Sequence, residues 1–171
     1  MKATTLLLLP LLLFPMLSQA QDKDYSEDVS SIDNIMHALY ASISGEKGVA
    51  RDWNRFQFLF AENARLVPTR KSEEGIVFQQ WTPAEYAEMA AEWFNNTGFF
   101  ESEISRELDQ FGPIAHVFST YISRRTAEGE IFARGINSIQ LFHDGDRWWI
   151  MSVYWSGEAD DQPIPDSYLP D

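Results

Sequence analysis

Hydrophobic and polar residues alternate through the last third of the chain, and this period of two predicts four long strands, at 99–110, 114–125, 131–142 and 147–155. Asp144-Gly145 separates the last two strands. An Asp-Gly pair between alternating segments is a strong hairpin signal, because a type I′ turn needs positive φ at both central residues. A two-residue turn centred there pairs Asn137 with Ser152 and Gly135 with Tyr154. This register predicts which side chains share a face of the sheet.

The chain ahead of these strands has the spacing of amphipathic helices. The predicted helices begin at the caps Ser30, Asp52 and Thr82. The third has the clearest start, because Thr82 to Glu85 combines a capping box with Pro83 at the first helical position. Two short strands are predicted between the second and third helices, at 64–68 and 76–80.

Three helices followed by an antiparallel meander indicate an α+β fold. We expect a cone-shaped, strongly bent antiparallel or mixed sheet that wraps around the three N-terminal helices and leaves one mouth open. The domain is expected to extend over residues 30–157.

The two ends of the chain differ in composition from this domain. Residues 1–20 have a basic start, an apolar run and small residues before a cleavage point, which is typical of a cleaved signal peptide. Its removal leaves 151 of the 171 residues, the size of one domain. Residues 21–29 are predicted to be an acidic lead-in and residues 158–171 a flexible acidic tail. We therefore expect an exported protein, periplasmic or secreted, with no membrane segment after cleavage.

Charge and cysteine content exclude several classes of function. The net charge of −13 becomes −14 when the leader with its single Lys2 is removed. Because phosphate binding needs clustered Lys and Arg, neither nucleic acid nor anionic lipid is an expected partner. The sequence has no cysteine, which excludes disulfides, thiol nucleophiles and cysteine-ligated metals. No two histidines have the spacing of metal ligands, so we expect neither a metal nor another cofactor.

Both faces of the predicted hairpin are apolar. One face combines small or polar residues, such as Gly135, Asn137 and Ser152, with bulky residues near the turn. We assign this face to the inside of the cone, because the small residues would leave space for a pocket at one end. The expected ligand-binding residues come from this face, its neighbouring strand and the helices, and they are Trp53, Trp93, Ser119, Asn137, Ser152 and Tyr154. The alternative is that these residues fill the core and satisfy one another's hydrogen bonds.

The opposite, convex face carries more apolar surface than a monomer usually leaves bare. We therefore expect a homodimer that forms through this face. The expected interface residues are His116, Phe118, Phe142, Trp149, Met151 and Trp155.

Several segments resemble a known family. Arg51-Asp52-Trp53-Asn54-Arg55-Phe56 and Ala64-Arg65-Leu66 are similar to the helical half of a nuclear-transport-factor-2-like (SnoaL-like) domain. The sheet of the same family is similar to three further segments of this sequence, 111–121, 135–141 and Arg147-Trp148-Trp149-Ile150. The resemblance implies a conical fold, frequent dimerisation and a pocket for a small, often apolar molecule. It points to an exported branch without an assigned activity, in a superfamily that includes ketosteroid isomerases, scytalone dehydratase and polyketide cyclases.

Acid–base chemistry in such a pocket would need a carboxylate or a histidine that faces a hydrogen-bond donor. Asp52 is the candidate carboxylate on the strength of the resemblance, although a role as helix cap is sufficient to explain it. His37 lies one turn after Asp33, which could orient its imidazole, or the two could simply pair on the helix surface. Tyr121 or Tyr154 is the candidate donor.

These observations favour an exported domain that binds a small, mostly apolar molecule in an aromatic-lined conical pocket. One alternative is a lyase or isomerase that acts on a small apolar, polyketide-like or steroid-like substrate by acid–base catalysis. The other is a purely structural dimerisation domain whose cone is filled. A continuous cavity above about 300 Å³ would favour binding or catalysis over a filled cone.

Overall fold

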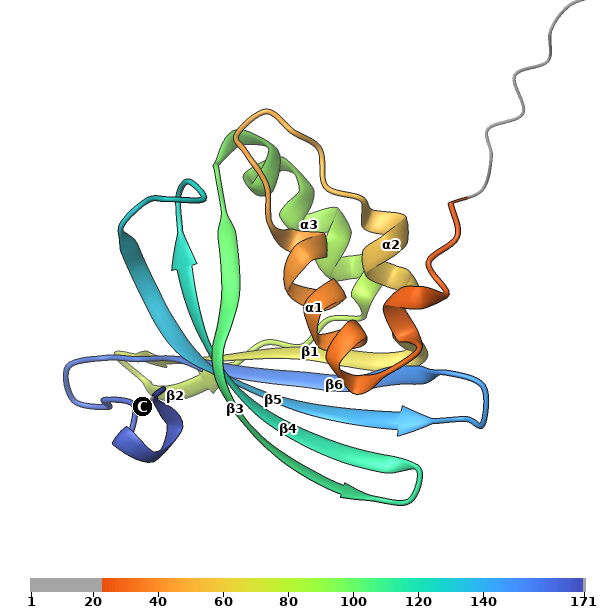
Figure 1. The fold of residues 1–171 in the computed structure, drawn as a ribbon. Coiled ribbons are helices and arrows are strands. Elements are labelled where there is room, and N and C mark those ends of the chain that lie inside the picture. Colours follow the sequence, from red (N-terminus) through yellow and green to blue (C-terminus); the bar gives the residue numbers. More distant parts are fainter. Residues whose placement is uncertain (1–22, 171) are drawn as a thin grey trace, which may run out of the picture.

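The computed structural model describes residues 23–170, so the predicted signal peptide lies outside the described residues (Figure 1). Short 3₁₀ helices, η1 (Glu27–Val29) and η2 (Asp166–Tyr168), lie near its two ends. Between them the chain forms α1 (Ile32–Ile43), α2 (Trp53–Phe58), β1 (Phe60–Ser72), β2 (Gly75–Phe78), α3 (Pro83–Asn96), β3 (Phe100–Phe111), β4 (Ile114–Arg124), β5 (Ile131–His143) and β6 (Trp148–Gly157).

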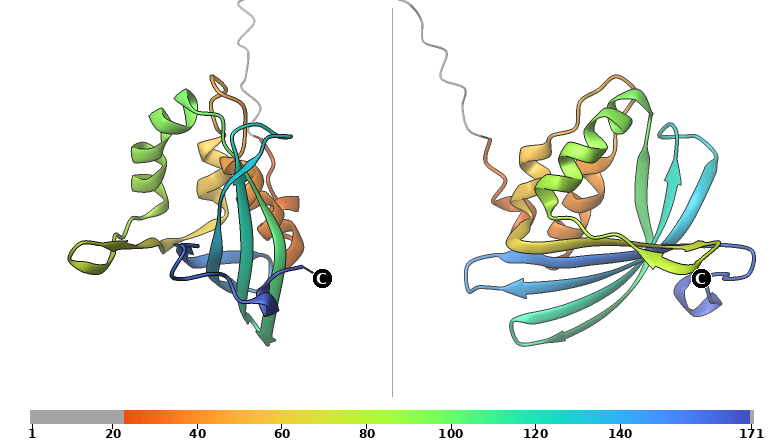
Figure 2. Two further views of the ribbon diagram at one scale, coloured as in Figure 1. Left: turned by 90° about the vertical axis from the view of Figure 1, so that its left-hand side faces the viewer. Right: turned by 180° about the vertical axis from the view of Figure 1, so that it is seen from behind.

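The six strands form one open, mixed sheet in the order β2-β1-β6-β5-β4-β3. Every pair of neighbours is antiparallel except β1 and β6, which run parallel. The sheet bends strongly, and the three α-helices lie in its hollow (Figures 1 and 2). This arrangement confirms the α+β fold and the mixed, bent sheet that the sequence predicts.

Side-chain hydrogen bonds of capping residues mark the first residue of each α-helix, at or next to the positions predicted from the sequence. The hydroxyl of Ser31, one residue after the predicted cap, accepts the Asn34 N–H and begins α1. Asp52 caps α2 as predicted. The capping box of α3 is also present as predicted, with Pro83 in its first turn. These short-range hydrogen bonds satisfy N–H groups that a helix leaves free at its start.

The core lies between the helices and the concave face of the sheet. The buried side of α1 presents Ile35, Met36 and Leu39 to it, and α2 contributes Phe56. Across from them lie fully buried residues of β4, β5 and β6, namely Val117, Ile139, Leu141 and Ile150. Apolar burial of this kind is the main stabilising contribution to folding.

The predicted register of the β5–β6 hairpin is wrong. His143 pairs with Trp148, so the loop has four residues, and Asp144 does not take the positive φ of a type I′ turn. The Asp144 carboxylate instead accepts hydrogen bonds from the backbone N–H groups of Asp146 and Arg147, at 2.9 Å each. These bonds stabilise the longer turn. The Trp149 indole also donates to this carboxylate at 2.6 Å and is the main cause that lowers the pKa of Asp144 to about 2, and the two backbone bonds lower it further.

A register shift farther along the hairpin has the larger consequence for the site. Leu141 pairs with Ile150 but Gln140 pairs with Ser152, so one extra residue of β6 is inserted at this bulge. Because strand side chains alternate between faces, one inserted residue reverses the facing of everything beyond it. Asn137 therefore pairs with Trp155, and Trp155 rather than Tyr154 shares its concave face.

The segment after β6 turns back over the convex face of the sheet (Figure 1). The Thr120 hydroxyl donates to the backbone carbonyl of Tyr168 at 2.7 Å, and the Tyr168 ring lies 5.0 Å from that of Phe118. Ile164 is buried, and Arg134 forms an ion pair with Glu158. Residues 158–170 thus contact the sheet, although the sequence predicts a flexible tail there. No helix within residues 23–170 is long and apolar enough to cross a membrane.

Candidate functional site

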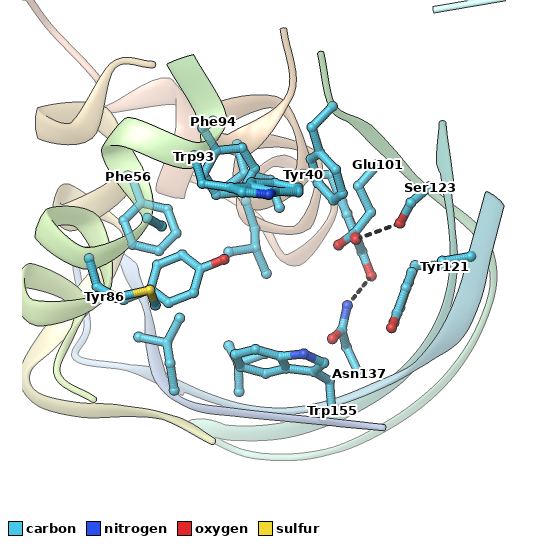
Figure 3. A pocket seen from close by; sticks show the side chains of 18 of the residues that line it. Tyr40, Phe56, Tyr86, Trp93, Phe94, Glu101, Tyr121, Ser123, Asn137 and Trp155 are labelled. Atoms are coloured by element: carbon cyan, nitrogen blue, oxygen red, sulfur yellow. Dashed lines mark hydrogen bonds between the residues drawn. The ribbon is translucent and has the colours of Figure 1, made fainter. Parts of the chain in front are cut away.

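A cavity of about 360 Å³ lies between α3 and the concave face of the sheet (Figure 3). The predicted apolar stripe of α3 lines the helical side of its wall, with Tyr86, Met89, Ala90, Trp93 and Phe94. Leu39, Tyr40 and Ile43 of α1 and Phe56 of α2 complete that side. Strand residues close the other side, and they include Phe99, Glu101, Tyr121, Ser123, Phe132, Asn137, Val153 and Trp155. The wall is mostly aromatic and aliphatic, with a few polar groups on the strand side.

Among residues 23–170, Glu101 is the only carboxylate that lines this cavity. Its side chain accepts a hydrogen bond from the Ser123 hydroxyl at 3.0 Å, on the neighbouring strand. Its backbone N–H donates to the Ser44 hydroxyl at 3.0 Å, which fixes the start of β3 against the end of α1. Protein atoms enclose most of this residue, which also lines an outer groove between α1 and β3. This burial raises the pKa of Glu101 to about 7, and the bond from Ser123 offsets only part of the rise.

Two tyrosines of the cavity wall face the same region as Glu101. Tyr86 enters from α3, and Tyr121 lies on the strand wall near Glu101 (Figure 3). Burial is the main cause that raises the pKa of each phenol, and the nearby Glu101 charge raises both further. Both phenols therefore keep their protons and remain hydrogen-bond donors at neutral pH.

Gly135 makes the position of Tyr121 possible. The two residues pair directly across β4 and β5. A Cβ atom at Gly135 would lie 2.5 Å from the Tyr121 hydroxyl and 2.4 Å from the carbonyl oxygen of Ser156. A larger residue would therefore displace the phenol from this wall.

A hydrogen-bonded chain connects the cavity wall with the outside of the cone. The Asn137 amide donates to the Tyr40 hydroxyl at 3.0 Å, and this hydroxyl shares a 2.7 Å bond with Ser119. Ser119 donates to Glu103, which forms an ion pair with Arg106 at 2.6 Å. Every side chain in this series has a hydrogen-bonding partner, so these residues support the cavity wall. Glu101 takes no part in the series.

The mouth of the cavity has an aromatic rim with one stacked cation. Met89, Trp93 and Phe132 keep 52%, 45% and 45% of their surface exposed although all three line the cavity. The Arg125 guanidinium lies 3.9 Å from the centre of the Phe132 ring and 5.5 Å from that of Trp93. Both distances are within the range of cation–π attraction.

Two predicted catalytic residues lie away from the cavity. Asp52 is engaged at the start of α2, where it accepts the Arg55 N–H and pairs with Lys23 at 2.7 Å. His37 is exposed and lines an outer groove between α1 and β3. Asp33, its proposed orienting partner, forms an ion pair with Arg106. The third candidate, Tyr121, does line the cavity.

The predicted ligand-binding residues divide into three groups. Trp93 and Asn137 line the cavity. Trp53 and Ser119 lie behind its wall, where Trp53 packs edge-on against Phe94 and Ser119 holds Tyr40. Ser152 and Tyr154 point to the convex face because of the bulge in β6, and Tyr154 keeps 47% of its surface exposed there.

The residues predicted for a dimer interface lie on the convex face, with one exception. Phe142, Trp149 and Met151 are at least partly exposed on it, and His116 bonds to Ser138 across its strands at 3.1 Å. Phe118 is partly covered by the C-terminal segment. The exception is Trp155, which the bulge turns into the cavity, where its ring meets that of Tyr86 edge-on at 6.2 Å.

Sequence reasoning missed Glu101 because β3 has an unusually polar sequence. Its acidic residues resemble a solvated strand face, and only the tertiary packing of α1 against the start of β3 reveals the burial. One signal was available. Glu101 lies two residues after the buried Phe99, so strand alternation places both on the same face.

No protein-family model and no curated protein matches this sequence. Solved structures with similar folds are numerous. A protein of unknown function with a cystatin-like fold from Nostoc punctiforme PCC 73102 shares 11% identity and a TM-score of 0.58, over 75% of this chain and 90% of its own. LinA shares 7% identity and a TM-score of 0.56, over 82% and 91%.

A putative ketosteroid isomerase from Shewanella frigidimarina NCIMB 400 is 16% identical with a TM-score of 0.50, over 72% of this chain and 92% of its own. At such low identities the likeness concerns the fold alone. The bent mixed sheet, the three helices in its hollow and these neighbours lead to one conclusion: the chain has the nuclear-transport-factor-2-like (SnoaL-like) fold that its sequence resembles.

Proposed function

We propose that this protein binds a small, mostly apolar molecule inside its cone. The main support for the proposal is the cavity of about 360 Å³. It is larger than the roughly 300 Å³ above which ligand binding is favoured over a filled, purely structural cone. Its wall is mostly apolar, while Glu101, Asn137 and the hydroxyl groups of tyrosines on both its helical and strand sides supply a few polar contacts. This combination is typical of sites for small organic ligands.

Titration with N-phenyl-1-naphthylamine, a neutral fluorescent probe, tests this proposal. We expect saturable binding of one probe per mature chain. Ala133→Trp should prevent it, because Ala133 lines the cavity and a large ring there fills it. Ala127→Trp is the matched control, since Ala127 lines the outer groove between α1 and β3. Absence of saturable binding, or equal binding by the Ala133→Trp variant, would refute the proposal.

Glu101 favours a second candidate function, acid–base catalysis of the lyase or isomerase type. Its raised pKa is close to neutral, which suits a group that accepts and returns a proton. In this scheme the Glu101 carboxylate removes a proton from the carbon next to a carbonyl group. The Tyr121 phenol donates a hydrogen bond to the developing enolate oxygen, and Glu101 then returns the proton to carbon.

Deuterium exchange next to the carbonyl of a neutral apolar ketone, such as 2-decanone, tests the catalytic candidate by NMR. We expect the exchange rate to rise with pH through about 7, because the charged form of Glu101 is the base. Glu101→Gln should abolish the enzymatic exchange. If wild type and Glu101→Gln gave equal exchange rates, or if the wild type did not exceed the rate in buffer alone, the catalytic candidate would be refuted and only binding would remain.

We also propose that the protein is exported and acts as a homodimer. Apolar residues on the convex face beyond the C-terminal segment support a contact with a second copy, since Ile114, Phe142 and Met151 keep 57%, 38% and 40% of their surface exposed. Sedimentation at micromolar concentration tests the dimer, and a Met151→Glu variant should shift it to monomer. N-terminal sequencing of the protein from its native host tests cleavage after Ala20.

A further inference from the structure

We propose that the ligand is an organic anion, with an apolar body inside the cone and a carboxylate at the mouth that Arg125 binds. This inference rests on the proposed small-molecule function. It concerns Arg125, the cation at the rim of the cavity.

Arg125 is held at the mouth by both its backbone and its side chain. A Cβ atom at Gly98 would lie 2.2 Å from the Arg125 carbonyl oxygen, so the chain before β3 and the chain after β4 touch here. The guanidinium stacks on Phe132 and approaches Trp93, and both of these rings line the cavity. Stacking fixes the plane of the guanidinium at the edge of the opening.

The donor groups of this guanidinium are available. Within residues 23–170 no side chain or carbonyl group accepts a hydrogen bond from it, and none forms an ion pair with it. Its contacts are ring faces, which leave the N–H edge free for a planar, two-oxygen acceptor. The exposed Glu92, Glu128 and Glu130 lie near in sequence to the rim residues, and none of them pairs with Arg125.

The two charged groups of the site favour one orientation of the ligand. Glu101 lines the interior, and its carboxylate repels an anionic group placed there. Arg125 attracts such a group at the mouth. The apolar wall between them, which includes Trp93 and Phe132, suits a hydrocarbon chain or a ring system. An amphipathic carboxylate fits this order of groups better than a neutral molecule of the same size.

Displacement of N-phenyl-1-naphthylamine by decanoate and by 1-decanol at about pH 8 tests the inference, because the two competitors have the same chain length and differ in charge. In the Arg125→Gln variant we expect about tenfold weaker displacement by decanoate and no change for decanol. The matched control is Arg70→Gln, which removes the same charge from an exposed position on β1. Equal decanoate displacement by wild type and Arg125→Gln, or an equal loss for decanol, would overturn the inference.

Two further measurements keep the test decisive if Arg125→Gln does not fold. Arg125→Lys keeps the charge but loses the flat guanidinium, so its decanoate affinity should fall between those of wild type and the Gln variant. In the wild type, decanoate displacement should weaken several-fold from low to high salt while decanol displacement does not. A salt-independent decanoate affinity would contradict a role for Arg125. Failure of the wild type to bind either the probe or decanoate would instead refute the proposed function itself.

Discussion

Replacement of Glu101 by Gln should stabilise the protein at alkaline pH. Burial raises the pKa of this carboxyl to about 7 from its usual 4.5. Between these two pH values the folded protein holds a proton that the unfolded chain has lost. The free energy of unfolding therefore falls as the pH rises through this window, and above pH 7 it stays at the lower value.

The size of this effect follows from the two pKa values. Their difference, at about 1.36 kcal/mol per unit, corresponds to about 3 kcal/mol. A Gln side chain carries no charge and still accepts the hydrogen bond that Ser123 donates at 3.0 Å. The variant should therefore gain up to about 3 kcal/mol at pH 8, and its advantage should shrink to below about 1 kcal/mol near pH 5.

Urea unfolding followed by tryptophan fluorescence measures this advantage at several pH values between 5 and 8. Groups with lowered pKa values, such as Asp144, contribute equally to both proteins and cancel in the difference. Glu107→Gln is the matched control, because it makes the same substitution at an exposed position of the same strand. A Glu101→Gln variant that is no more stable at pH 8 than at pH 5, relative to wild type, would show that the carboxylate is hydrated and would refute the reasoning.

Three other substitutions test the supports of the site by urea unfolding. Asp52→Ala removes the cap of α2 and should cost about 1 kcal/mol without changing probe binding; a large loss of binding would place Asp52 in the site after all. Gly135→Ala should cost roughly 1–3 kcal/mol, since its Cβ would lie 2.4 Å from the Ser156 carbonyl oxygen, and a neutral result would contradict the tight packing described here. Arg51→Met should cost roughly 2–4 kcal/mol because the guanidinium donates to carbonyl groups of Ile43, Gly45, Glu46 and Val49, and a stable variant would show that water replaces it.

Features set by local chemistry were predictable from the sequence. The cap of α2 at Asp52, the capping box of α3 and the apolar stripe of α3 depend on neighbours within one or two helical turns. The mixed, bent sheet followed from the order of the elements and from the family resemblance. On the concave side, Ser119 and Asn137 were also assigned correctly, because the β4–β5 register is regular between them.

The remaining site depended on features that alternation alone cannot reveal. One inserted residue opposite Gln140 exchanged Tyr154 for Trp155 on the concave face, and a bulge has no reliable sequence signal of its own. The burial of Glu101 arises from tertiary packing at the start of β3, where α1, far from it in sequence, packs against the strand. Tertiary packing therefore determined both the site's aromatic floor and its one carboxylate.

A crystal structure of the protein with bound N-phenyl-1-naphthylamine would show where a ligand binds. We expect the naphthalene ring inside the cone, between Trp93 and Trp155 and beside Glu101. A second hollow, of about 260 Å³, lies on the convex face between Tyr154 and the C-terminal segment. Probe density only in that hollow, or a cone whose side chains have collapsed to fill it, would contradict the claim that the concave cavity is the binding site.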